Sequence, residues 1–84
     1  MVSTTSLDRL AVGRTGRILH VNGENAMRHR LMDLGFTPGT EITALHRAMS
    51  GDPTAYRIRG TVIAIREIDA GNVIVDPGAR DYTR

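Results

Sequence analysis

The sequence contains no cysteine and no tryptophan, and it has no long apolar run. Without cysteine there is no disulfide, no thiolate metal ligand, no iron–sulfur cluster and no cysteine nucleophile. No apolar stretch approaches the roughly 18 residues that a membrane-spanning helix needs, and the polar first residues do not resemble a signal peptide. We therefore expect a cytoplasmic protein that folds without covalent cross-links.

Lysine is missing too: all 11 basic residues are arginines, and the 9 acidic residues leave a net charge of +2. Arginine raises the isoelectric point because it keeps its proton, but so small a net charge is too weak a field to attract nucleic acid by itself. Aromatic residues make up only 4% of the chain, which leaves few rings for bases to stack on. The composition therefore argues against a nucleic-acid binder.

The chain carries no recognisable catalytic group. Its acidic residues are scattered rather than paired, and Ser3, Ser6 and Ser50 do not lie in a nucleophile elbow. The segment 13–17 has two glycines but neither the lysine nor the following helix of a phosphate-binding loop. We predict no enzymatic activity, no catalytic residue and no cofactor.

Histidine offers the one serious metal candidate. His29 and Asp33 stand at i and i+4 of a predicted helix, so both could face one ion, whereas His20 and His46 fall on different predicted strands. Two ligands on an exposed helix without a third are usually a solvated pair. We therefore predict no metal site.

At 84 residues the chain has room for one domain, which we place at 1–84 with an ordered core at about 7–77. Apolar periodicity, glycines and prolines predict a helical turn capped by Ser6 at 6–10, a strand at 17–21, a helix at 24–34, strands at 40–47, 54–59, 61–65 and 72–75, a turn at 67–71 and a frayed tail at 79–84. Too few residues separate the later strands for helical crossovers, so the sheet should be mainly antiparallel. The fold class is all-β: a small SH3-like barrel of five to six short antiparallel strands with one inserted α-helix.

The predicted helix and the turn after it are the most sharply specified stretch. Met27, Leu31 and Leu34 form one apolar stripe at i, i+4 and i+7, which we expect to face the core. Gly35 can adopt the positive φ that ends a helix, and Pro38 and Gly39 occupy the centre of a predicted type II turn. We interpret Leu31, Leu34, Gly35, Pro38 and Gly39 as a structural motif.

Two predicted strands carry further detail. Leu45 breaks the apolar alternation of its strand, which predicts a bulge nearby. In the next strand Tyr56 and Ile58 share one face, and Arg57 and Arg59 share the other.

The candidates for contact with a partner protein are exposed arginines and methionines: Met32, Met49, Arg57 and Arg59, with Arg47 as a further member of the arginine patch. Arginine favours protein interfaces. Arginines that simply keep a barrel soluble, and isolated surface methionines, are also common. Both interpretations stay open at this point.

The ordered set of these motifs resembles the FeoA family of bacterial ferrous-iron uptake. Residues 30–40 (RLMDLGFTPGT) resemble the family's central signature of helix, glycine and Pro-Gly turn. The segments 13–18 (GRTGRI), 51–53 (GDP), 57–60 (RIRG) and 64–66 (AIR) resemble its other parts, so that the match runs from about residue 7 to residue 75.

The resemblance implies a non-enzymatic accessory protein that binds and modulates FeoB, the membrane transporter with a cytosolic GTPase domain. Met49 and Ser50 precede Gly51 where the family often has proline and an apolar residue, so a contact through this loop would be altered here. A second interpretation is a free-standing regulatory barrel like the C-terminal domain of iron-dependent repressors, although the chain lacks a DNA-reading helix pair. A third is a KOW-type nucleic-acid-binding module, although such modules do not supply the helix and Pro-Gly insertion.

Overall fold

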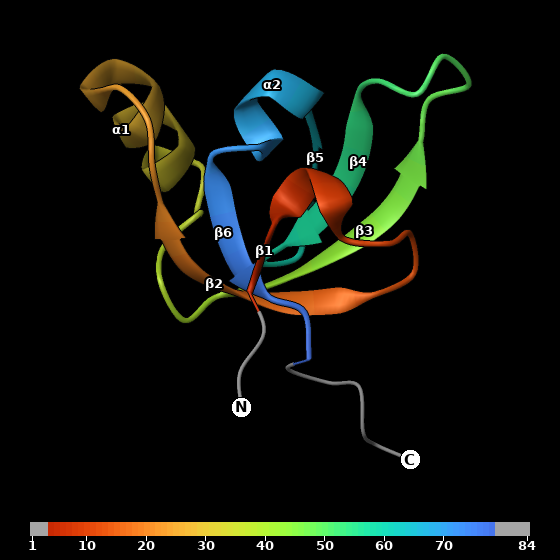
Figure 1. The fold of residues 1–84 in the computed structure, drawn as a ribbon, viewed down its shortest axis with the longest axis horizontal. Coiled ribbons are helices and arrows are strands. Elements are labelled where there is room, and N and C mark those ends of the chain that lie inside the picture. Colours follow the sequence, from red (N-terminus) through yellow and green to blue (C-terminus); the bar gives the residue numbers. More distant parts are fainter. Residues whose placement is uncertain (1–3, 79–84) are drawn as a thin grey trace.

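The computed structural model describes residues 4–78 of the chain. Within this range the elements follow one another as β1 (Thr5–Ser6), the 3-10 helix η1 (Leu7–Arg9), β2 (Thr15–Val21), α1 (Asn25–Asp33), β3 (Glu41–Arg47), β4 (Thr54–Ile58), β5 (Thr61–Ile65), α2 (Glu67–Ala70) and β6 (Val73–Asp76). Figure 1 shows a curled sheet with η1 and α2 over its centre and α1 beside one end of β2.

The sheet is antiparallel at every pairing, and its strands lie in the order β1-β6-β2-β3-β4-β5. The strands β3, β4 and β5 form a meander, whereas β6 returns to lie between β1 and β2. The predicted antiparallel sheet with one helix inserted after an early strand is confirmed. The strand that the sequence did not predict is β1, in the N-terminal segment, where Thr5 pairs with Val75 and Ser6 with Ile74.

Two irregularities bend the sheet into its curl. The register of β3 against β4 shifts between Ala44 and His46, which confirms the bulge predicted at Leu45. A second shift lies between Ile18 and His20 in the pairing of β2 with β6. Because a bulge adds one residue to its strand, the apolar residues on both sides of it can face the core even though their parity differs.

The core lies inside the curl and is built from buried apolar side chains of β2 to β6, the helices and the loop after α1: Leu7, Leu10, Ile18, Leu31, Phe36, Ile42, Ala44, Tyr56, Ile58, Ile65, Ala70, Val73 and Val75. β4 alternates as expected, with Tyr56 and Ile58 buried and Arg57 exposed. The predicted inner face of this strand is confirmed.

The apolar stripe of α1 meets the core only in part. Leu31 is 1% exposed and Met27 packs partly against the core, but Leu34 is 44% exposed. The prediction that Leu34 belongs to a core-facing stripe is therefore wrong. Leu34 occupies the C-cap position, where the chain turns away from the helix axis, and Phe36 supplies the next buried side chain instead.

Several element boundaries differ from the prediction. The helical turn near the N-terminus is present and buries Leu7 and Leu10, but the Ser6 side chain makes no capping hydrogen bond. The segment expected as a turn at 67–71 contains the short helix α2. The tail at 79–84 lies outside the described residues. No helix between residues 4 and 78 is long and apolar enough to cross a membrane.

Candidate partner-binding surface

The end of α1 is a Schellman motif, in which backbone N–H groups beyond the helix satisfy its last carbonyls. The Gly35 N–H donates to the Met32 carbonyl at 3.0 Å, and the Phe36 N–H donates to the Leu31 carbonyl at 3.1 Å. Gly35 has a φ of 109°, so the positive φ predicted for it is confirmed. The motif places Phe36 in the same buried cluster as Leu31.

The turn after the helix, with Pro38 and Gly39 at its centre, is held by a side chain from a distant hairpin. The Thr40 N–H donates to the Thr37 carbonyl at 3.1 Å and Gly39 has a φ of 91°, as a type II turn requires. The Arg59 Nη2 donates to the hydroxyls of Thr37 and Thr40, each at 3.4 Å. Arg59 therefore ties the turn between α1 and β3 to the β4–β5 hairpin.

Arg59 does not lie on the strand face where the alternation placed it. β4 ends at Ile58, and Arg59 and Gly60 form a two-residue hairpin turn with φ values of 53° and 78°. The prediction that Arg57 and Arg59 share one strand face is therefore wrong, because the chain reverses one residue earlier than expected. A left-handed arginine costs about 1–2 kcal/mol, and its hydrogen bonds to the two threonine hydroxyls offset part of that cost.

Arg57 is the exposed cation on the outer face of β4. Its cross-strand neighbours are Thr43 on β3 and Val62 on β5, and its guanidinium has no hydrogen bond or ion pair to any residue between 4 and 78. Arg47 does not extend this patch. Beyond the bulge in β3 it stands opposite the buried Thr54, and its Nε donates to the Thr54 hydroxyl at 3.2 Å.

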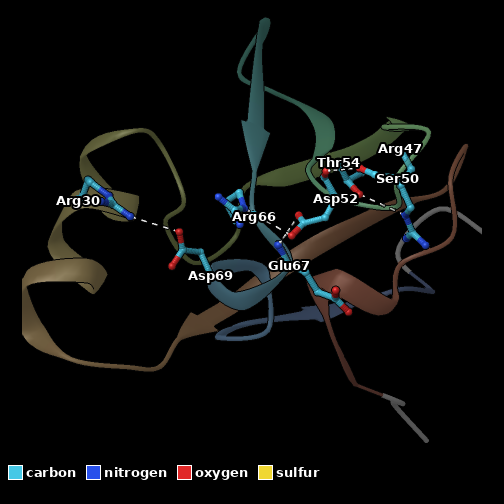
Figure 2. A network of polar contacts seen from close by, with 8 residues as sticks. All are labelled: Arg30, Arg47, Ser50, Asp52, Thr54, Arg66, Glu67 and Asp69. Carbon is cyan, nitrogen blue, oxygen red and sulfur yellow. Dashed lines mark hydrogen bonds and ion pairs between the residues drawn. The ribbon is translucent and has the colours of Figure 1, made fainter.

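Met49 stands in the loop between β3 and β4 with its side chain fully exposed. The base of this loop is anchored through Asp52, as Figure 2 shows. The Asp52 carboxylate accepts the Glu67 N–H at 2.8 Å and pairs with Arg66 at 3.4 Å, while the Ser50 hydroxyl donates to the Asp52 carbonyl at 2.9 Å. The loop therefore presents an apolar tip on a fixed base.

The predicted contact residues lie along the β4–β5 hairpin and at its two ends. Met49 precedes β4, Arg57 lies on it, and Arg59 follows it. Met32, half-buried in the last turn of α1, lies near the Arg59 end because Arg59 binds the turn that follows this helix. These residues are therefore spread along the hairpin rather than gathered in a compact patch.

A cavity of about 30 Å³ lies beside the β3–β4 loop and is lined by Asp8, Arg47, Gly51, Thr54, Tyr56 and Glu67. It has room for one or two water molecules but not for an organic substrate. The Tyr56 hydroxyl donates to the Leu7 carbonyl at 3.4 Å, and burial raises the pKa of this hydroxyl above its usual 10.0.

The histidines are not gathered into a ligand set. His20, His29 and His46 are exposed on β2, α1 and β3 respectively. Across residues 4–78, no group of three or more histidine, aspartate or glutamate side chains is placed to hold a metal ion.

One feature of the surface escaped the sequence reasoning. β5 forms an edge of the sheet, and its second residue, Val62, is 56% exposed. The sequence carried a signal for this feature, because residues 61–65 contain no charged residue, no proline and no glycine.

Comparisons with known proteins agree with the resemblance seen in the sequence. The FeoA domain family model matches residues 5–77. The chain is 33% identical over 70 residues to the Fe(2+) transport protein A/Fe(2+) transporter FeoB fusion protein of Porphyromonas gingivalis. That match covers 83% of this chain but only 8% of the fusion protein, so the chain spans a small part of this relative.

Solved structures show the same fold. The FeoA protein of Chlorobium tepidum has a TM-score of 0.84 at 31% identity, covering 95% of this chain and 76% of that one. Stenotrophomonas maltophilia FeoA in complex with zinc, an SH3 domain protein, has a TM-score of 0.77 at 26% identity, covering 86% and 89%. A manganese-dependent transcriptional repressor, 14% identical with a TM-score of 0.81 over 92% of this chain and 43% of its own, shares the fold alone. The sheet is thus SH3-like, and the chain belongs to the FeoA domain family.

Proposed function

We propose that this protein is a non-enzymatic accessory of ferrous-iron transport that binds the cytosolic part of a FeoB-type transporter and modulates it. The observation that carries the proposal is the fusion relative, in which transport protein A and the transporter FeoB are parts of one polypeptide. Fusion gives two modules a high effective concentration for each other, which is useful when the two act together.

The contact surface we propose follows the β4–β5 hairpin. Met49 offers exposed apolar area at one end, and Arg57 offers an exposed charge on the outer face that pairs with no residue between 4 and 78. Arg59 and Met32 border the other end, where Arg59 is already engaged with two threonine hydroxyls. We therefore expect Met49 and Arg57 to contribute more to binding than Arg59 and Met32.

Calorimetry with the isolated cytosolic domain of a FeoB-type transporter tests this function. Arg57→Glu reverses a surface charge at the proposed contact and should weaken binding about tenfold, which corresponds to 1.4 kcal/mol. Arg9→Glu is the matched control, because it makes the same change on the exposed side of η1. Equal affinity of the two variants would place the contact elsewhere, and no binding of the unchanged protein would refute the proposed partner.

A further inference from the structure

β5 lies at one edge of the sheet, and within residues 4–78 no strand covers its outer side. Among the described residues it pairs with β4 only. The opposite edge strand, β1, has only two residues. Over the described part of the chain, the sheet therefore has one edge long enough to receive a further strand.

Four backbone groups point from β5 into this open side. The turn at 59–60 has two residues, so the flanking pair Ile58–Thr61 exchanges hydrogen bonds, as does every second pair along the hairpin. The N–H and C=O groups of Val62 and Ala64, which lie between those pairs, face away from β4. Neither residue has a backbone hydrogen bond on that side to residues 4–78, and both are exposed.

β5 has none of the usual protection of an edge strand. Residues 61–65 contain no charge and no proline, and their pairing with β4 runs without a bulge. Proteins normally protect an open edge with such features because it invites pairing with another chain. A short, exposed and β-branched edge is the feature that binding by strand addition uses.

The charged residues around the edge of β5 favour one kind of binding partner. Residues 54–66 contain Arg57, Arg59 and Arg66 and no acidic residue. Arg57 stands next to Val62 across the hairpin, and the other two arginines lie just beyond the ends of β5. Self-pairing through β5 would bring two sets of arginines together, whereas an acidic strand would meet them with opposite charge.

We propose that the open edge of β5 binds an extended acidic segment of a partner protein as an additional strand. The identity of that partner, the cytosolic domain of a FeoB-type transporter, rests on the proposed function. The edge itself can be tested without it.

Hydrogen exchange measured by NMR reports directly on the backbone groups concerned. The Val62 and Ala64 amides should exchange about tenfold more slowly when the transporter domain is bound, while Ile63, already bonded to β4, should change little. A peptide of alternating valine and glutamate should protect the same two amides, and a valine–lysine peptide of the same length should not. The two peptides test the edge independently of the transporter.

Val62→Pro removes one outward N–H while leaving the bonds to β4 in place, and proline is tolerated on an edge strand when its nitrogen faces solvent. This variant should lose binding, whereas Val62→Ala, which keeps the N–H, should retain most of it. Ala64→Pro serves the same purpose if Val62→Pro fails to fold.

The outcomes separate the two proposals. If the transporter domain still binds the proline variants and does not protect the two amides, the proposed strand addition at β5 is refuted and the proposed function stands. Protection by the acidic peptide without transporter binding would support the edge and refute the proposed function. Protection that appears with rising concentration of the protein alone would show self-pairing and overturn the acidic occupant, as would a lack of protection by either probe.

Discussion

Gly35→Ala tests whether this glycine has a second role besides ending α1. At a φ of 109° an L-residue is strained, which costs about 1–2 kcal/mol. A Cβ at Gly35 would also lie 3.2 Å from the Cδ of Arg59. The arginine would have to shift, and its two hydrogen bonds to Thr37 and Thr40, both already 3.4 Å long, would weaken. At an exposed site this second cost is about 0.5–1 kcal/mol, so we expect roughly 1.5–3 kcal/mol in total.

Gly13→Ala separates the two costs. Gly13 has a φ of 93°, but a Cβ there meets no atom of the described residues within 4 Å, so its substitution carries the conformational cost alone. Urea unfolding followed by circular dichroism measures both variants. Gly35→Ala should cost about 0.5–1 kcal/mol more than Gly13→Ala, and this excess should vanish when Arg59 is also alanine.

Two results would refute this reasoning: equal costs at Gly35 and Gly13, or an excess at Gly35 that survives Arg59→Ala. Larger side chains at position 35 should cost stability in the order of how poorly they tolerate a positive φ. Gly35→Val should destabilise the protein more than Gly35→Asn, because β-branched residues tolerate this region worst and asparagine is enriched in it.

Further predictions concern the core, pH, metal and nucleic acid. Leu31→Ala should cost about 2–5 kcal/mol in urea unfolding, whereas Leu34→Ala, at a half-exposed position, should cost under about 1 kcal/mol; equal losses would contradict the packing of α1. Because the folded-state pKa of Tyr56 is raised, the stability from its buried neutral phenol is complete below pH 10.0 and falls as the pH rises through the folded pKa. Tyr56→Phe should flatten that alkaline loss in thermal melts, and an unchanged loss would assign it to other groups. Anaerobic calorimetry at neutral pH should show no sub-micromolar binding of Fe²⁺, and tight stoichiometric binding abolished by His29→Ala would contradict this. Tight binding of mixed oligonucleotides that falls steeply with salt would favour the nucleic-acid interpretation instead.

The parts of the fold that sequence reasoning predicted are those fixed by local chemistry. Gly35 stops the helix through its own backbone freedom, and Pro38 with Gly39 sets the turn through the preferences of two adjacent residues. The bulge at Leu45 was visible as a break in alternation along a single strand. Each of these features depends on only a few consecutive residues.

The errors come from contacts between distant residues. Leu34 continues the helical periodicity of Leu31, but the chain leaves the helix there and Phe36 takes the buried position, which depends on where the sheet lies. The left-handed conformation of Arg59 goes with hydrogen bonds to Thr37, 22 residues away, and to Thr40. A contact with so distant a partner leaves no trace in the local sequence. The apolar alternation therefore predicted a strand that ends at residue 59, one residue later than in the structure.

The same distant contact connects the structural motif with the proposed binding edge. The absence of a side chain at Gly35 leaves room for the arm of Arg59, whose guanidinium binds the turn around Gly39. Arg59 in turn begins the hairpin turn from which β5 starts, so the end of α1 and the open edge are joined through one side chain. Because Asp52 anchors the other end of β5 through Arg66 and Glu67, both ends of the edge strand are fixed to neighbouring elements. An edge held in this way is already extended before a partner arrives, which lowers the entropic cost of adding a strand to it.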